Sequence, residues 1–212
     1  GLYKGGGAMI RQAVCYLLAG VGEPSAWQRH SLATAFLASR IAKALPKCNI
    51  KLAVTGALLH DVGRQISCGL FHGLYGYFLL KGHRLFSQCA RFCVTHWLKG
   101  RTEEEILREG DLPAGCVKAL LALEDFVSLG VEDLVVNVAD SVARRDVVVS
   151  IHTRYEDAAR RYGASPWLAG NKQRTLRFKA QLDRLSKRDI YTLFPPFGTH
   201  ITPDMAFKEL GL

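Results

Sequence analysis

The residues of this 212-residue chain that can do chemistry are concentrated among its histidines. The sequence contains seven, and five of them lie between His30 and His96. His30 shares a helical stripe with apolar residues, and the adjacent pair His60 and Asp61 ends an apolar helical segment. Farther along, Asp140 is embedded in a nearly continuous apolar run. Because burying an unpaired imidazole or carboxylate costs free energy, all of these side chains need partners.

Two imidazoles and two carboxylates on three inward-facing helices form a ligand set for a metal ion. A mixed nitrogen and oxygen set of this kind suits Mn, Fe, Co, Zn or Mg. His72 and His96 are two further candidate ligands, since each shares a helical face with small or apolar residues. A lone inward histidine is more often an ordinary core residue. Metal binding is therefore inferred from the ordered set as a whole and not from any single histidine.

The pattern has a fixed order along the chain. Its members are His30, the segment His60-Asp61-Val62-Gly63-Arg64, His72, His96 and Asp140. This order resembles the HD superfamily of metal-dependent phosphohydrolases, in particular its small HDIG-type proteins, from about residue 25 to about residue 163. The resemblance implies an all-α bundle in which His30, His60 and the two aspartates hold one metal ion. In relatives with two ions, His72 and His96 hold the second, and Asp61 bridges the pair.

The number of ions decides the charge that the site presents to a phosphate group. One divalent ion with two carboxylates has no formal charge, whereas two ions leave +2, which attracts phosphate strongly in a partly dry pocket. Cations follow three of the ligands closely in the sequence. We predict Asp61, Arg64 and Lys99 as catalytic residues, and Arg64, Lys99, Arg101 and Arg144 as substrate-binding residues.

The sequence therefore predicts a phosphohydrolase that cleaves a phosphomonoester or phosphodiester bond of a nucleotide. The attacking water would be activated by one or two ions of Fe, Mn, Co, Zn or Mg. Two other classes stay open. An HD-fold di-iron oxygenase acting on a small polar substrate would use the same six ligands. A non-catalytic HD module would bind a nucleotide or RNA, and the basic, aromatic-containing stretch 151–190 is compatible with RNA binding.

Composition limits the classes of protein that fit. The chain is 49% hydrophobic and 22% charged, which is typical of a globular domain rather than a disordered one. Its net charge of +9 favours anionic partners. Six cysteines without a CxxC pair are typical of free thiols in a reducing cytosol, so a cytoplasmic location is predicted. The apolar run 13–22 is too short for a membrane anchor, which needs about 20 residues.

The predicted fold class is all-α, an HD-type helical bundle with extra C-terminal helices, because strand signals are scarce and apolar residues recur with helical spacing. Residues 1–8 are interpreted as a leader left by cloning, 9–163 as the HD domain, and 164–212 as a helical extension and tail. Helices are predicted over 9–18, 25–45, 50–61, 72–80, 87–98, 102–110, 117–129, 131–145, 147–162 and 171–189. The valine run 147–149 has strand propensity, but without a partner run it is predicted to be helical.

Overall fold

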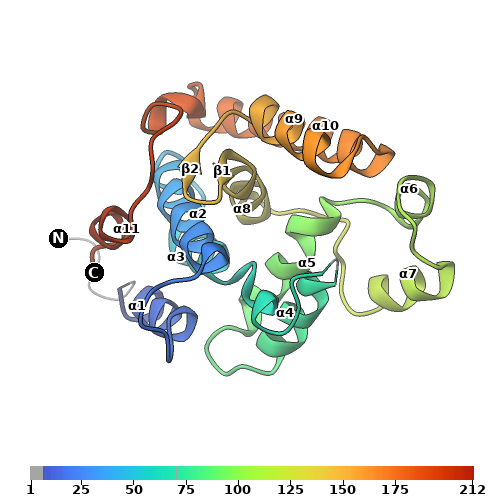
Figure 1. Cartoon of the computed structure of the whole chain (residues 1–212), viewed down its shortest axis with the longest axis horizontal. Coiled ribbons are helices and arrows are strands. Elements are labelled where there is room, and N and C mark those ends of the chain that lie inside the picture. The colour runs from blue at the N-terminus through green and yellow to red at the C-terminus, as the bar shows by residue number, and fades with distance from the viewer. Residues whose placement is uncertain (1–6, 70) are drawn as a thin grey trace.

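The computed structural model describes residues 7–69 and 71–212, and it confirms the predicted all-α class (Figure 1). Its α-helices are α1 (Gly7–Leu17), α2 (Ala26–Lys43), α3 (Ile50–Leu59), α4 (His72–Lys81), α5 (Ala90–Leu98), α6 (Glu103–Glu109), α7 (Ala114–Leu121), α8 (Val131–Val142), α9 (Ile151–Tyr162), α10 (Pro166–Ser186) and α11 (Pro203–Leu210). The described part of the chain also contains the 3₁₀ helices η1 (Val62–Gln65), η2 (Ser87–Cys89) and η3 (Ile190–Leu193), and the strands β1 (Ala143–Arg144) and β2 (Val147–Val148).

Three helices form the centre of the bundle. α3 packs on α2, and α8 packs on both of them, while α5 packs against α3, α4 and α8. The layer of α9 and α10 covers one side of α8, and α6 and α7 lie at the opposite end of the molecule from α1 and α11 (Figure 1). The expected inward-facing helices, which carry His30, the His60-Asp61 pair and Asp140, are therefore neighbours in space.

Local sequence signals set several helix ends. The predicted capping box at Thr102 is present: the Thr102 hydroxyl accepts a hydrogen bond from the Glu105 amide at 3.3 Å, and the Glu105 carboxylate accepts one from the Thr102 amide at 3.0 Å. The helix predicted over 117–129 ends instead at Leu121. Downstream, the Asp125 carboxylate accepts hydrogen bonds from the amides of Val127 and Ser128, and this local turn competes with continued helix.

The prediction that the valine run is helical is wrong. β2 pairs in antiparallel fashion with β1, so that Ala143 lies opposite Val148. The partner run escaped notice because it consists of only two residues at the end of α8. The reversal is made possible by Arg145, which adopts a left-handed conformation with φ of 57°. A further strand-like segment supports the hairpin, since the Val148 amide donates to Thr199 O at 2.9 Å.

The C-terminal part is more helical than predicted. α10 begins at Pro166 rather than residue 171, and the predicted tail contains α11. Both helices start with a signal that the sequence carries: a serine or threonine cap followed by proline in the first turn, as in Thr202-Pro203. Residues 1–6 of the predicted leader lie outside the described residues, whereas Gly7 and Ala8 belong to α1. No described helix has the length and apolar character that crossing a membrane requires.

Three glycines allow the segments that carry His72 and His96 to approach each other closely. A Cβ atom on Gly63 would overlap the carbonyl oxygen of His72, and one on Gly73 would overlap the carbonyl oxygen of Cys93. A Cβ atom on Gly76 would lie 2.8 Å from the Cys93 sulfur. Glycine therefore brings η1, α4 and α5 into backbone contact, which places their polar side chains around one point.

We expect Gly63→Ala to lower the free energy of unfolding by about 1–3 kcal/mol, because the obstacle is backbone and cannot rotate away. Gly115→Ala is the matched control. It lies in α7 with no atom within 4 Å of its Cβ, so it should raise stability by about 0.5–1 kcal/mol. Urea unfolding followed by circular dichroism measures both. Equal stability of the two variants would contradict the close approach.

Candidate metal centre

The centre is built around the pair that follows α3. His60 and Asp61 are almost fully buried, at 0% and 3% exposure. The two oxygens of Asp61 face different neighbours. Oδ1 lies 3.0 Å from His72 Nε2 and 3.5 Å from His96 Nε2, whereas Oδ2 lies 3.9 Å from His60 Nε2. Asp61 therefore stands between two sets of histidines, which is the position that a bridging carboxylate requires.

Two groups of potential ligand atoms result, and they share Asp61. The first contains His30, His60 and Asp61, and the second contains Asp61, His72 and His96. Within each group the ligand atoms lie within 4.8 Å of one another, a separation that allows one cation to contact all of them. Asp140 on α8 extends the first group, because its Oδ1 lies 2.9 Å from His30 Nε2 and 3.7 Å from His60 Nε2.

The backbone fixes the orientation of all four imidazoles. The Nδ1 atoms of His30, His60, His72 and His96 lie 3.0, 2.7, 2.9 and 3.0 Å from the carbonyl oxygens of Arg145, Ala57, Gly69 and Phe92, respectively. Because a carbonyl only accepts, each Nδ1 must carry the proton. In the neutral form of each imidazole, Nε2 then presents a lone pair to the centre, which is the tautomer that metal-binding histidines use.

This arrangement suits a cation and is poorly satisfied without one. His72 Nε2 and His96 Nε2 lie 3.2 Å apart, and in the tautomers above their lone pairs face each other. Among the described residues, His60 Nε2 and Asp61 Oδ1 are buried and form no hydrogen bond. Buried polar atoms are normally paired, and a bound metal ion is one accepted reason for an exception. The residues therefore fit one or two divalent ions.

The pKa values of the buried groups favour ligand binding. Burial would raise the pKa of Asp61, but His60, His72 and His96 outweigh this and hold it well below its usual range. The pKa of Asp140 is likewise low, since its histidine neighbours outweigh the effect of burial. Burial lowers the pKa of His96 to about 4, so this imidazole is neutral at pH 7 and keeps its lone pair.

His60 is the exception, and it shows what the two carboxylates require. Burial would lower the pKa of its imidazole, but the negative charges of Asp61 and Asp140 prevail and raise it. The carboxylates thus attract positive charge to the position of His60 Nε2. A metal ion at that position meets the same requirement with a larger charge than a proton.

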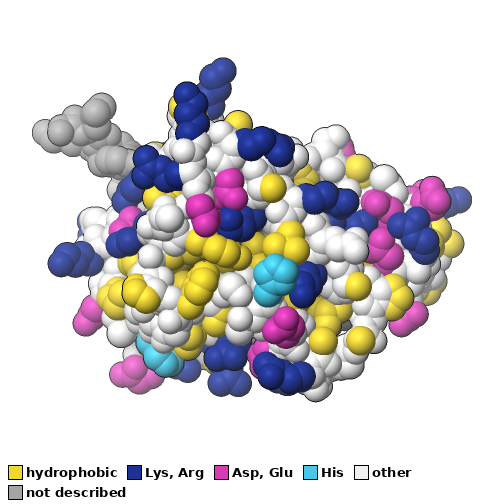
Figure 2. Space-filling model, turned by 90° about the horizontal axis from the view of Figure 1, so that it is seen from above, with side chains coloured by type: hydrophobic (Ala, Val, Ile, Leu, Met, Phe, Trp, Pro, Cys, Tyr) yellow, Lys and Arg dark blue, Asp and Glu magenta, His cyan; other side chains and the backbone are white. Residues whose placement is uncertain are grey.

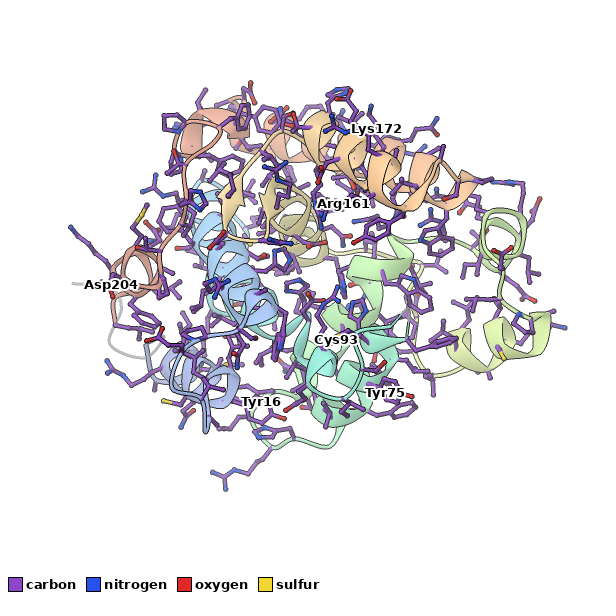
Figure 3. All side chains as sticks on the ribbon, viewed as in Figure 1. Tyr16, Tyr75, Cys93, Arg161, Lys172 and Asp204 are labelled. Atoms are coloured by element: carbon purple, nitrogen blue, oxygen red, sulfur yellow. The ribbon has the colours of Figure 1, made fainter. Side chains whose placement is uncertain are left out.

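The centre opens into a pocket of about 640 Å³. Its walls contain five of the six candidate ligands, with His60 buried behind them. The pocket extends from the centre toward the layer of α9 and α10, and Arg161 of α9 lies between that layer and the rest of the bundle (Figure 3). Volumes of about 300–1,000 Å³ are typical of small-molecule sites.

Three of the four predicted phosphate-binding cations line this pocket: Arg64, Lys99 and Arg144. Arg64 Nε donates to Asp61 Oδ2 at 2.6 Å. Lys99 is only 4% exposed, and its ammonium donates to the Asn137 side chain at 3.0 Å. Both cations therefore stand beside the centre in positions set by fixed partners.

Arg101, the fourth predicted cation, lies elsewhere. Its fully buried guanidinium donates to Glu109 at 2.9 Å and Asn171 at 2.7 Å, and it stacks 3.7 Å from the Trp167 ring centroid. Positive φ angles at Lys99 and Gly100 turn the chain away from the pocket after α5. The structure thus gives Arg101 a role in holding α6 and α10 together, and places it outside the pocket lining.

Sequence reasoning missed the basic residues that the C-terminal part contributes. Arg145, Arg154 and Arg161 line the same pocket, together with Tyr155 and Tyr162. The prediction treated the last two arginines as part of a general basic stretch. Their spacing of seven residues on one helix, with small Ala158 between them, is the signal that could have placed them on a common face.

Comparison with known proteins identifies the family. The model of the HD domain family matches residues 27–145, which contain all six candidate ligands. The chain therefore belongs to the HD domain family, as the order of its histidines and aspartates predicted. Members of this family are mostly metal-dependent phosphohydrolases, and membership indicates a metal-dependent hydrolase.

A curated relative is a tRNA (cytidine(56)-2'-O)-methyltransferase from Picrophilus torridus. It is 28% identical over 123 residues, which are 58% of this chain and 33% of the relative. This chain thus spans about a third of the length of that protein. No solved structure matches the chain.

We expect protein purified without added metal to hold up to two transition-metal ions per chain, and His96→Ala to hold about one, because His96 belongs to only one ligand group. Asp61→Ala should lose at least one equivalent, since Asp61 belongs to both. His152→Ala, an exposed histidine on α9, is the control and should keep the wild-type content. Elemental mass spectrometry measures the metal content of each variant, and far-UV circular dichroism checks that its fold persists. Unchanged content in Asp61→Ala would contradict the assignment.

Proposed function

We propose that this protein is a metal-dependent phosphohydrolase whose small substrate is a nucleotide. It hydrolyses a phosphomonoester or phosphodiester bond of that nucleotide. The observation that carries the proposal is the pair of ligand groups sharing Asp61 at the base of a cation-lined pocket. Family membership supports the reaction class. The size of the pocket and the cations beside the centre support a phosphorylated substrate of nucleotide size.

Formal charge favours a site with two ions. One divalent ion balances Asp61 and Asp140, so it leaves no net attraction for phosphate, whereas two ions leave +2. The second ligand group consists of one shared carboxylate and two imidazoles, which are neutral in the tautomers fixed by the backbone. It therefore adds a cation without adding a new negative charge, and this supports a site that attracts anions.

The residues of the chain have separable roles in this proposal. When bound, divalent ions lower the pKa of a bound water and polarise the phosphoryl oxygen. Asp61, Asp140 and the four histidines would hold them. Arg64 uses Nε to bind Asp61, which leaves its two Nη groups for a phosphate oxygen at a position fixed beside the ions. Lys99, held by Asn137, supplies a second positive charge for the developing phosphoryl charge.

The other two classes remain outcomes of the same assay. A di-iron oxygenase would use the same six ligands, and it would consume oxygen with a small polar substrate in place of hydrolysing phosphate esters. A binding module would bind a nucleotide or RNA without turnover. The name of the relative from Picrophilus torridus concerns tRNA, so RNA belongs in the set of compounds tested.

We expect chelation to abolish hydrolysis of nucleotides in a broad phosphatase and nucleotidase screen, and Mn, Co or Fe to restore it, because the ligand set suits these ions. Release of inorganic phosphate or of the nucleoside product is the measurement. If no phosphorylated compound is hydrolysed while oxygen is consumed with a small polar substrate, the oxygenase class replaces the proposed one.

Arg64→Ala should lower kcat/KM by about 30-fold to 1,000-fold, equivalent to about 2–4 kcal/mol of transition-state stabilisation. The metal content must be measured in parallel, because Arg64 also contacts Asp61. Arg177→Ala, an exposed arginine on α10 outside the pocket lining, is the matched control and should leave kcat/KM unchanged. If Arg64→Ala lowers kcat/KM by less than about threefold while the metal content stays unchanged, Arg64 does not bind the substrate phosphate and is only a surface charge.

A further inference from the structure

A second group of arginines lines the pocket away from the metal centre. Arg144 comes from β1, and Arg154 and Arg161 come from α9. Among the described residues, none of these three lies within ion-pair distance of Asp61 or Asp140, in contrast to Arg64. These three arginines are therefore not paired with the carboxylates of the centre.

The α9 side of the pocket is one continuous helix face. The residues that α9 contributes are Arg154, Tyr155, Ala158, Arg161 and Tyr162. Their spacings of one, four, seven and eight residues from the first member place all of them on the same side of an α-helix. Ala158 separates the two arginines by a small side chain, which leaves space between their guanidinium groups.

One carboxylate holds two of these arginines in place. Asp157 accepts a hydrogen bond from Arg161, and its Oδ1 lies 3.9 Å from Arg144 Nη1. The guanidinium of Arg154 has no hydrogen-bond or ion-pair partner among the residues that the structure describes. The group thus combines two tethered cations and one unpaired cation against one carboxylate, so it keeps net positive charge on a pocket wall.

We propose that Arg144, Arg154 and Arg161 form a second phosphate subsite, which makes this enzyme selective for nucleotides that carry a chain of two or more phosphate groups. The inference rests on the proposed function, since it takes the first phosphate to lie at the metal centre. Guanidinium groups bind phosphate oxygens in bidentate fashion, so three of them around one pocket wall suit a second phosphate better than a neutral group.

Most of the proposed subsite lies beyond the residues that match the family. The match to the HD domain family ends at residue 145, so it contains Arg144 but not Arg154 or Arg161. The ligands for metal come from the family domain, and two of the three distal cations come from α9. This division separates residues for bond cleavage from residues that select among phosphorylated compounds.

The distribution of charge favours a small substrate over an extended nucleic acid. Figure 2 shows the molecule from the side of α9 and α10. On the coloured part of this face, Lys and Arg side chains are separated by acidic, apolar and uncharged groups, and they do not form a continuous stripe. Backbone binding of a nucleic acid uses many phosphates along a continuous basic path. The arginines of the second subsite instead converge on the pocket that contains the metal centre.

The test is equilibrium binding to the protein as purified. The probes are adenosine monophosphate and an adenosine triphosphate analogue whose bridging oxygens are replaced by methylene groups, which resists hydrolysis. Isothermal titration calorimetry should give at least a tenfold tighter Kd for the triphosphate analogue. Arg154→Ala and Arg161→Ala should each raise the Kd of the triphosphate analogue by about tenfold, which removes most of this difference. Each should change the Kd of the monophosphate by less than twofold.

Two control variants make the result specific. Arg177→Ala removes one exposed arginine from neighbouring α10 and should leave both Kd values unchanged. Arg154→Lys retains the charge and should recover part of the affinity for the triphosphate analogue. A loss in Arg177→Ala equal to that in Arg154→Ala would show a general charge effect and would overturn the subsite, as would equal affinity of wild-type protein for the two probes.

Failure of the subsite and failure of the proposed function give different results. A protein that prefers the triphosphate analogue through Arg154 but hydrolyses no phosphate ester would contradict the function and leave the subsite standing. A protein that hydrolyses phosphate esters but binds the two probes equally would contradict only the subsite. A single-stranded oligoribonucleotide that binds more tightly than the triphosphate analogue, with Arg154→Ala affecting only the oligoribonucleotide, would assign the arginines to RNA and overturn the inference.

Discussion

The structure depends on one electrostatic constraint: two carboxylates, Asp61 and Asp140, are held at the centre of a helical bundle with only 4% and 15% of their side-chain surfaces exposed. Buried charge is unfavourable unless it is matched, and each missing partner costs several kcal/mol. The surrounding imidazoles place their Nε2 atoms 2.9–3.9 Å from the carboxylate oxygens, so that a cation between them would supply the matching charge. Because the same lone pairs suit a metal ion, the cost of burying the carboxylates becomes a gain in affinity for cations.

That constraint explains features of the fold that are otherwise unrelated. Each imidazole must present Nε2 inward, so each Nδ1 binds a backbone carbonyl, and three of these carbonyls come from the histidine's own local segment. His30 differs, because its partner is Arg145 O, 115 residues away. The second ligand group also requires α4 to approach both η1 and α5 closely, which glycine at positions 63, 73 and 76 permits.

The ordered pattern of His and Asp residues predicted the family and the convergence of the six candidate ligands, because these residues are polar exceptions on apolar helices. Helical spacing of apolar residues predicted the all-α fold. Three features escaped prediction, for physical reasons. The β1–β2 hairpin is made of two-residue strands, which are too short for periodicity to detect. Arg101 follows His96 closely in the sequence, but two residues with positive φ turn it toward Glu109. The contribution of Arg154 and Arg161 depends on how α9 packs on α8, which local sequence does not determine.

The hairpin links the two halves of the pocket through a single turn. Arg145 occupies a left-handed conformation that costs about 1 kcal/mol for a residue with a Cβ atom. In that conformation its carbonyl accepts from His30 Nδ1. The preceding residue, Arg144, faces the pocket and approaches Asp157 of α9. One backbone reversal therefore orients a candidate metal ligand and places a distal cation. Since the segment 198–201 hydrogen-bonds to the same hairpin, the C-terminal extension stabilises the geometry of the centre as well as the wall that α9 provides.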